Sequence, residues 1–388
     1  MNIILFDTEA RKRLFPLTAT RAVADVRIGI LTVKERWEKM TRAAVFVLTD
    51  QYLQPLYETI SPGNYVFVDA SIIPSPDIMQ RIINLHEGEG ISDENGLVAG
   101  KITVNSLPVI RELQVLFKNT SSVSGVKRLM FPWQIFQWNE DMTNFDFKLL
   151  TKGRMSHDHN DSIHVIKASQ IFIEDGAYIS YSNLNASSGP IYIGKNTTIM
   201  EGCFIRGPFA LCEGAVLKMG TKIYGATTIG PYCTAGGEIK NSVMTGYSNK
   251  AHEGYLGDSV IGEWCNFGAG TSNSNLKNTA REVKIWNYYE NNYLPAGNKC
   301  GVIMGDYSKT AINTSINTGT VAGVCCNIFG EGLTPKFIKD FSWGAKGQSR
   351  YEFDKAVQDI DNWKKMKNKT TSEPETKVLK HIFENYNN

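Results

Sequence analysis

Aliphatic residues recur at every sixth position through the middle of the chain. The unbroken run is Ile193, Ile199, Ile205, Leu211, Leu217, Ile223 and Ile229. A period of six fits neither the 3.6-residue turn of an α-helix nor the alternation of a half-buried strand. It is typical of hexapeptide repeats, in which one short strand and one sharp turn together use six residues. We therefore predict a left-handed parallel β-helix with three hexapeptides in each triangular coil.

A second column supports the first. The residue four places after each aliphatic is small in most repeats, as a tight corner requires; these residues are Thr197, Cys203, Ala215, Thr221, Thr227 and Cys233, with Phe209 as the exception. We place the β-helix domain at residues 163–335, with its first repeats at Ile173 and Ile179. We expect residues 180–190 to loop out of a corner and residues 279–300 to form an extended lobe.

The first 150 residues have a different pattern, in which short apolar runs alternate with amphipathic ones. We predict strands at 2–6, 44–48 and 65–69 and helices at 33–42, 76–86 and 131–139. This alternation favours an α/β, Rossmann-like domain at residues 1–150 with a mostly parallel sheet. The stretch at 87–95, rich in Gly, Asp and Glu, reads as a loop.

Two further segments complete the predicted organisation. A polar stretch indicates a linker at 151–162, between the α/β domain and the β-helix. Residues 336–388 read as a C-terminal helical extension. Its first helix shows apolar residues at 3–4 spacing, namely Phe353, Val357, Ile360, Trp363 and Met366, and a second helix covers 375–386.

Composition narrows the class of protein. The formal net charge of +2 gives no reason to expect a nucleic-acid or membrane partner. The seven cysteines are odd in number and form no CxxC pair, so we read them as reduced core residues. The N-terminus lacks a signal-peptide layout, and no stretch approaches the roughly 20 apolar residues of a membrane span. We therefore expect a cytoplasmic protein.

The best candidate for chemistry is the glycine-rich, polar run at 240–275, which contains His252. Histidine titrates near neutral pH and is the usual general base for an amine or hydroxyl nucleophile. Positive charge for a phosphorylated substrate and hydrogen bonds at fixed positions would come from Lys240, Lys250, Lys284, Asn266 and Asn275. Because a β-helix is a prism without a natural cleft, we expect the site between neighbouring prisms of a homotrimer.

The same run resembles the acetyltransferase half of the bifunctional N-acetylglucosamine-1-phosphate uridyltransferase/glucosamine-1-phosphate acetyltransferase family. The matching positions are Lys240, His252, Tyr255, Leu256-Gly257-Asp258, Ile261-Gly262, Asn266, Gly268 to Thr271 and Asn275. The resemblance implies that His252 deprotonates the amine of a glucosamine-1-phosphate-like substrate, with acetyl-CoA as the acetyl donor. It also implies that Asn275 orients the acetyl group and that the sugar phosphate is held by Lys240, Tyr255, Asn266, Lys284 and Arg206.

The N-terminal run from Arg13 to Arg21, RLFPLTATR, resembles the opening of sugar nucleotidyltransferases. The resemblance implies nucleotide binding by Arg13, Thr18 and Arg21, with Mg²⁺ if this domain is active. Residues 7–12 contain no glycine where that family has a glycine-rich loop, and Val23 stands in place of a lysine. We assign no resident metal ligand in the chain.

Together the two resemblances imply acetyl transfer to an amino-sugar phosphate, possibly coupled to nucleotidyl transfer that gives a UDP-sugar. Two alternatives stay open: a non-catalytic solenoid that binds a sugar nucleotide or a partner, and a nucleotidyltransferase using UTP or dTTP as its main activity. A zinc hydratase would require three histidines in neighbouring coils, and His164 and His252 are far apart in the repeat.

Overall fold

The aliphatic column forms the interior of a parallel β-helix. All seven residues of the run are at most 2% exposed. Residues 18 positions apart lie opposite each other in neighbouring strands, as Ile193 and Leu211 do, followed by Leu211 and Ile229. Eighteen residues are three hexapeptides, so the predicted coil of three repeats is confirmed.

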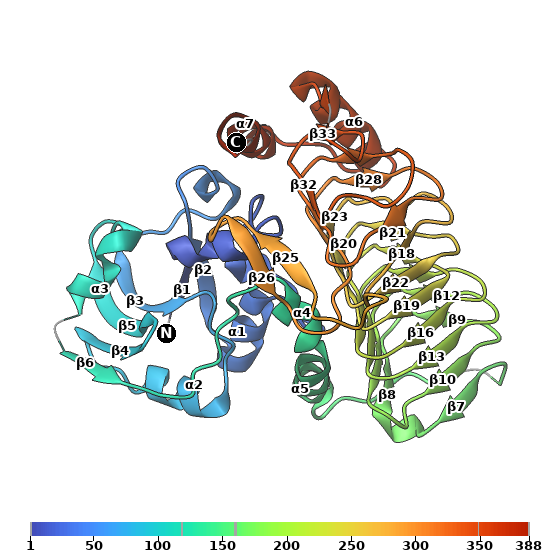
Figure 1. The fold of residues 1–388 in the computed structure, drawn as a ribbon. Helices are drawn as coiled ribbons and strands as arrows, with labels where there is room; N and C mark the ends of the chain where they lie inside the picture. The colour runs from blue at the N-terminus through green and yellow to red at the C-terminus, as the bar shows by residue number, and fades with distance from the viewer. Residues whose placement is uncertain (1, 118, 159–160, 348, 387–388) are drawn as a thin grey trace.

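Three parallel sheets form the walls of the β-helix (Figure 1). The β22 face contains β7 (His164–Ile166), β10 (Asn183–Asn185), β13 (Phe204–Arg206), β16 (Lys222–Tyr224), β19 (Glu238–Lys240) and β22 (Tyr255–Gly257). The β23 face contains β8 (Ile171–Ile173), β11 (Ile191–Ile193), β14 (Phe209–Leu211), β17 (Thr227–Ile229), β20 (Val243–Gly246), β23 (Val260–Glu263), β27 (Ile303–Met304), β30 (Val321–Ala322) and β32 (Phe337–Ile338).

The β21 face contains β9 (Tyr178–Ile179), β12 (Thr198–Ile199), β15 (Val216–Leu217), β18 (Thr234–Ala235) and β21 (Asn249–Lys250). A four-stranded sheet follows in later coils, made of β28 (Lys309–Thr310), β31 (Asn327–Ile328), β33 (Ser342–Trp343) and β34 (Ser349–Arg350). Strand β24 (Ser272–Asn273) contacts β22 and pairs with β29 (Ser315–Ile316).

The two predicted interruptions of the repeat differ in structure. Residues 180–190 do not loop out, since β10 lies within them and pairs with β7 and β13. Leu184 is five positions after Ile179 rather than six, yet it stays in the buried column opposite Ile205. The predicted lobe at 279–300 is confirmed as the antiparallel hairpin of β25 (Lys284–Asn287) and β26 (Asn292–Pro295), which extends toward the N-terminal lobe (Figure 1).

The stacked column should dominate the stability of the solenoid. Leu217 is fully buried and lies opposite Ile199 and Ala235 in the adjoining coils. Leu217→Ala removes buried methyl groups and leaves a cavity, so we expect the unfolding free energy to fall by about 2–5 kcal/mol. Thermal unfolding followed by circular dichroism measures the change. The exposed Met219, replaced by alanine, should leave the midpoint almost unchanged.

The computed structural model describes residues 2–117, 119–158, 161–347 and 349–386, so positions 159 and 160 of the predicted linker lie outside the described residues. The N-terminal lobe has a six-stranded sheet in the order β2-β1-β3-β5-β4-β6. Its strands are β1 (Asn2–Phe6), β2 (Ala44–Leu48), β3 (Gly63–Asp69), β4 (Glu89–Asp93), β5 (Gly96–Val104) and β6 (Asn119–Ser122).

The three predicted N-terminal strands are confirmed, but the sheet is mixed rather than mostly parallel. Strand β5 pairs antiparallel with β3 and β4. The prediction of a loop at 87–95 is wrong, because β4 occupies most of that stretch. This glycine- and acid-rich strand, paired with β5 and β6, lacks the apolar alternation that identifies a strand in sequence.

Helices cover the N-terminal sheet and join it to the solenoid. The α-helices are α1 (Val33–Thr41), α2 (Pro76–Ile83), α3 (Leu113–Leu116), α4 (Trp133–Gln137) and α5 (Asn139–Thr151). Short 3₁₀ turns are η1 (Glu9–Leu14), η2 (Val23–Asp25), η3 (Gln54–Leu56), η4 (Ile110–Glu112) and, in the solenoid, η5 (Ala168–Gln170). Helix α1 begins with a capping box. The Thr32 hydroxyl accepts from the Glu35 backbone N–H, and the Glu35 carboxylate accepts from the Thr32 backbone N–H.

The N-terminal lobe docks on the β23 face of the solenoid. One continuous hydrophobic core joins the lobe to four outward-facing residues of that face, Val243, Val260, Ile303 and Val321. Helices α4 and α5 contact β23 and β17 respectively. The α/β lobe, the hairpin and the solenoid are therefore packed parts of one structure rather than separate domains on a flexible tether.

The C-terminal helices α6 (Phe353–Lys365) and α7 (Glu373–Asn385) pack over the end of the solenoid and against the N-terminal lobe (Figure 1). Ile360 is buried as predicted, whereas Met366 follows the helix end and is 76% exposed. All seven cysteines are free and buried, which confirms their reading as core residues. Within the described residues no helix is both long and apolar enough to cross a bilayer.

Candidate functional site

The β22 face presents the outward side chains of its six strands, because strand residues alternate between the interior and the outside. Lys240 on β19 lies opposite Tyr224 on one side and Gly257 on the other. The Lys240 ammonium is 5.8 Å from the centroid of the Tyr224 ring. Because Gly257 has no side chain, the Tyr255 ring can lie over it; a Cβ atom at this position would be 2.2 Å from the Tyr255 hydroxyl oxygen.

A polar network surrounds the Tyr255 hydroxyl. The Asn275 amide donates to the Tyr255 hydroxyl at 3.1 Å and to the Asp258 carboxylate. The Asn241 amide donates to the same carboxylate at 2.7 Å. Burial and the charge of Asp258 raise the pKa of Tyr255 to about 12. Tyr255 therefore stays protonated at neutral pH, and its hydroxyl proton can be donated to a ligand while Asn275 holds the oxygen.

Of the predicted site residues, the structure thus brings Tyr255 and Asn275 into contact and places Lys240 on the same face. His252 is exposed in the turn that leads from β21 to β22, at one edge of this face. Arg206 lies on β13, two strands below Lys240, with its side chain exposed.

Two predicted residues lie elsewhere. Asn266 bridges Asn249 and Lys309 on the β21 side of the prism. Lys284 is exposed on β25 of the hairpin, between Val283 and Ile285, which are buried in the core shared with the N-terminal lobe. A single copy of the chain therefore does not gather all the residues that the resemblance groups together.

Lys250 is not available to a phosphate, contrary to expectation. Its side chain occupies the buried column opposite Ala235 and is 2% exposed. The ammonium donates to the Gly236 carbonyl at 3.0 Å and to the His252 carbonyl at 2.5 Å. Lys250 therefore anchors the backbone of the turn that carries His252.

Burial lowers the pKa of Lys250 to about 8, whereas the pKa of a lysine in an unfolded chain is ~10.4. Between these two values the unfolded state binds more protons, so this group makes stability rise with pH across that window. Lys250→Met should remove this part of the rise. Thermal midpoints at pH 7 to 10 measure it, and Lys240→Met should keep the wild-type profile. Identical profiles for wild type and Lys250→Met would contradict this interpretation.

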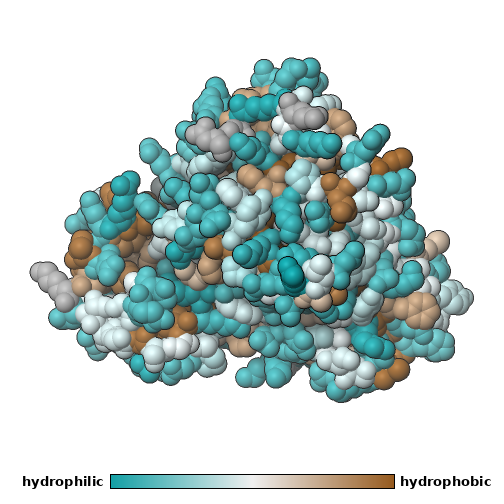
Figure 2. Space-filling view, viewed as in Figure 1, coloured by the Kyte–Doolittle hydropathy of each residue, from teal (hydrophilic) through white to brown (hydrophobic). Residues whose placement is uncertain are grey.

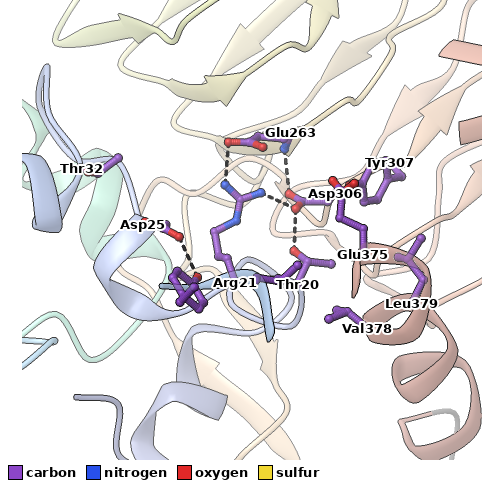
Figure 3. Close-up of a pocket in the computed structure, with 12 residues that line it drawn as sticks. Thr20, Arg21, Asp25, Thr32, Glu263, Asp306, Tyr307, Glu375, Val378 and Leu379 are labelled. Atoms are coloured by element: carbon purple, nitrogen blue, oxygen red, sulfur yellow. Dashed lines mark hydrogen bonds and ion pairs between the residues drawn. The ribbon is translucent and has the colours of Figure 1, made fainter. Parts of the chain in front are cut away.

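The N-terminal motif lies at the junction of all three parts of the molecule, beside a pocket of about 290 Å³ (Figure 3). The Arg21 guanidinium donates to Glu263 at 2.8 Å and to Asp306, both of which belong to the solenoid. The Thr20 hydroxyl donates to Asp306 at 2.5 Å, and the Glu263 amide donates to Asp306 at 2.7 Å. The two carboxylates raise the pKa of Arg21 and neutralise its charge.

The other two predicted nucleotide-binding residues are also engaged. Thr18 is fully buried, and its hydroxyl donates to the Arg11 carbonyl at 2.8 Å. Arg13 is partly exposed, with Nε 3.2 Å from the Glu290 carboxylate of the hairpin and the guanidinium over the Tyr289 ring.

The carboxyl edge of the parallel strands is closed by side chains of the protein itself. In place of a glycine-rich loop, η1 directs the buried Arg11 side chain toward Asp7, Asp50 and Tyr52. Burial raises the pKa of Asp7 to about 7. Asp69, at the end of β3, pairs with Arg128 at 2.6 Å. This edge is filled, where α/β nucleotide-binding sheets normally have a crevice.

The roles of several residues in these sites were not predicted from the sequence. Asp258 and Glu263 were visible within the motif, but nothing in their spacing marked Asp258 as the centre of a network. Asp306 follows the hairpin excursion, so its alignment with Glu263 leaves no periodic signal. Across the described residues, no three side chains of His, Cys, Asp or Glu gather as metal ligands would.

Comparison with known proteins finds partial matches to sugar-transferring proteins. Residues 3–155 match the family model described as Sugar nucleotidyl transferase. The chain is 29% identical over 221 residues to the "Bifunctional protein GlmU" of Methanocaldococcus jannaschii, covering 54% of this chain and 44% of that protein. It is 38% identical over 92 residues to the "Bifunctional sugar-1-phosphate nucleotidylyltransferase/acetyltransferase" of Sulfurisphaera tokodaii, covering 24% and 23%.

These matches span less than half the length of the curated relatives. Among solved structures, the Arabidopsis UDP-N-acetylglucosamine acyltransferase aligns over 60% of this chain and 90% of its own, with 13% identity and a TM-score of 0.28.

Proposed function

We propose that this chain, a GlmU-like protein as its motifs predicted, is a transferase that moves an acetyl group from acetyl-CoA to the amine of an amino-sugar phosphate. The observation that carries the proposal is the arrangement on the β22 face. Lys240 supplies a cation, Tyr255 supplies a protonated hydroxyl fixed by Asn275, and His252 lies at the edge of the same face. These groups match the needs of a phosphate, a sugar hydroxyl and a nucleophilic amine.

The proposed reaction follows from these roles. The His252 imidazole accepts a proton as the sugar amine attacks the thioester carbonyl, so a C–N bond forms and the C–S bond breaks. The thiolate of CoA leaves and takes a proton, which the imidazolium can return. Lys240 attracts the substrate phosphate, and the Tyr255 hydroxyl donates to a sugar oxygen.

We further propose that the site is completed in a homotrimer. His252 and Arg206 are exposed at the surface of a flat wall, and a flat wall does not exclude water from a thioester. The lower part of the β22 face also exposes apolar side chains, with Ile166 at 56% and Phe204 at 59%, around a groove of about 440 Å³. Covering these residues with a second prism would bury them and supply the missing wall.

The experiment for this proposal is release of free thiol from acetyl-CoA in the presence of phosphorylated amino sugars. Glucosamine-1-phosphate should support release, whereas glucose-1-phosphate, which has no amine, should not. Light scattering on the same preparation should give three times the mass of one chain. If no amino-sugar phosphate releases thiol, the alternative of a solenoid that binds sugar nucleotides without catalysis is favoured.

Nucleotidyl transfer by the N-terminal lobe is a second candidate, favoured by the match of residues 3–155 to the Sugar nucleotidyl transferase model. The phosphate of a sugar-1-phosphate would attack the α-phosphorus of UTP or dTTP and form a new P–O bond, and pyrophosphate would leave, with Mg²⁺ as the cofactor. The carboxylates at the sheet edge do not fit a metal site as they stand, because Asp69 is ion-paired with Arg128 and Asp7 is buried and accepts from Thr49. This activity would require the loop that contains Arg21 to separate from the solenoid.

A further inference from the structure

The pocket beside Arg21 is enclosed by the N-terminal lobe, the solenoid and helix α7 together (Figure 3). Among the described residues that line it, Arg21 is the one cation, and four carry carboxyl groups, namely Asp25, Glu263, Asp306 and Glu375. We propose that this pocket binds a small aliphatic amine as its ammonium ion. The proposal is independent of acetyl transfer on the β22 face, where none of these residues lies.

Two of the carboxylates keep an oxygen free for a ligand. Arg21 donates to one oxygen of Glu263 at 2.8 Å and to Asp306. Asp25 forms no ion pair with any described residue, and its carboxylate accepts one hydrogen bond there, from the Tyr57 hydroxyl at 2.7 Å. The second oxygen of Glu263 and the second oxygen of Asp25 are therefore available as acceptors.

The charges around the pocket leave an excess of negative charge. Lys364, on helix α6, donates to Glu375 and so pairs with that carboxylate. Asp25, Glu263 and Asp306 then share the single positive charge of Arg21. Burial raises the pKa of Asp25, as expected for a carboxyl group without a cation of its own. A positively charged ligand would supply the missing partner.

The Tyr307 hydroxyl gives a second, independent indication of a ligand. Tyr307 is only 8% exposed, and its hydroxyl has no hydrogen-bond partner within the described part of the chain. Burial and the nearby carboxylates of Glu375, Asp306 and Glu263 raise the pKa of Tyr307 well above its ordinary value, so the hydroxyl lies beside the charged groups of this pocket. The hydroxyl is not fully enclosed by protein atoms and therefore opens into the pocket. An N–H group of a ligand would satisfy its oxygen.

The remaining wall of the pocket suits the hydrocarbon part of an amine. Leu56, Val378 and Leu379 line this wall. The volume of about 290 Å³ is ample for a short carbon chain, since a cavity of about 150 Å³ accepts benzene. The side chains of Glu263 and Glu375 are 31% and 29% exposed, so the charged rim is open to solvent and a ligand can enter there.

An organic cation fits the pocket better than a metal ion does. In the described ranges, the acidic side chains do not converge in a group of three that could coordinate a metal. Asp306 already accepts from Thr20, from Arg21 and from the Glu263 backbone amide. A primary ammonium has three N–H donors, which equals the number of side chains with an open acceptor, Asp25, Glu263 and Tyr307.

Isothermal titration calorimetry on the full chain tests the proposal, with butylamine and 1,4-diaminobutane as probes at constant ionic strength. The comparison compounds are 1,4-butanediol, which is uncharged, and butyrate, which is an anion. We expect saturable binding of at least one amine and weaker or no binding of both comparison compounds. Absence of binding by both amines would overturn the proposal. So would butanediol binding as tight as that of the amines, since the charge would then contribute nothing.

Two variants test the assigned contacts. Asp25→Asn keeps the shape of the side chain and removes its charge, so it should weaken amine binding about tenfold. Tyr307→Phe removes only a hydroxyl without a partner, so the fold should be retained while binding weakens about fivefold. Tyr247→Phe is the matched control, because Tyr247 is another corner residue of the solenoid with positive φ and lies outside this pocket. Unchanged affinity in Asp25→Asn or in Tyr307→Phe would refute the assignment.

Further measurements separate this proposal from acetyl transfer. His252→Ala should bind the amine as the wild type does, and Asp25→Asn should release thiol from acetyl-CoA at the wild-type rate. A saturating amine should also raise the thermal midpoint of the wild type, because the pocket exists only in the folded chain. The rise should be smaller in Asp25→Asn. An equal rise in both proteins, or an equal loss of affinity in His252→Ala and Asp25→Asn, would contradict a separate amine site.

Discussion

Replacing His252 by alanine should lower the rate of thiol release from acetyl-CoA by roughly a hundredfold to ten-thousandfold. The protonated amine of an amino sugar is not a nucleophile, and its deprotonation needs a base at the edge of the β22 face. Because His252 is exposed in a turn, its removal should leave folding intact. The rate is measured with saturating acetyl-CoA and glucosamine-1-phosphate, and circular dichroism checks that the fold is retained.

His164 provides a matched control, since it is another exposed histidine of the solenoid and lies on β7 at the far end of the same face. His164→Ala should retain the wild-type rate. If His252→Ala and His164→Ala release thiol equally fast, then His252 is not the base. If the amine acceptor itself makes no difference to the rate, then the proposed substrate class is wrong.

Removing the Arg21 side chain should destabilise the protein by about 3–5 kcal/mol, because it leaves Glu263 and Asp306 as unpaired negative charges. Asp306 is only 2% exposed, so water can compensate little for the lost partner. The loop that contains Arg21 should also lose its main polar attachment to the solenoid. Thermal unfolding of Arg21→Ala measures the first effect, and limited proteolysis of the N-terminal loop measures the second.

Arg13→Ala is the matched control from the same motif. Its ion pair with Glu290 is partly exposed and should contribute no more than about 1 kcal/mol. Neutralising the partners of Arg21, with Glu263→Gln and Asp306→Asn in the Arg21→Met background, should recover part of the lost stability. A large effect of Arg13→Ala together with a small effect of Arg21→Ala would contradict the central position of the Arg21 cluster.

The two halves of the candidate chemistry were predictable to different degrees. The motif on the β22 face could be identified from spacing, because each coil repeats the same backbone and neighbouring strands lie a fixed number of residues apart. That regularity places Lys240 near Gly257 and Tyr255 before any contact is known. The network around Asp258 could not be identified in this way, since it depends on side chains that reach around a corner.

For the N-terminal motif, the sequence did not predict the surroundings of the candidate residues. Its residues suggested groups that face a nucleotide, yet Thr18 is buried and Arg21 is held by the solenoid. The missing glycines at 7–12 were a visible signal of a different loop. What replaces the loop, a 3₁₀ turn with Arg11 buried among Asp7, Asp50 and Tyr52, depends on partners that no local pattern reveals.

The sequence alone determined that the chain winds into coils of three hexapeptides, that its cysteines lie in the core and that helices follow the last coil. Each of these features follows from a local pattern of apolar residues, and such a pattern can be identified from residues that are close together in the sequence. Only the tertiary structure decided that the N-terminal lobe docks on the β23 face and that Arg21 meets Glu263 and Asp306. Those carboxylates are 43 positions apart and separated by a hairpin, and contacts between distant segments leave no periodic trace in the chain.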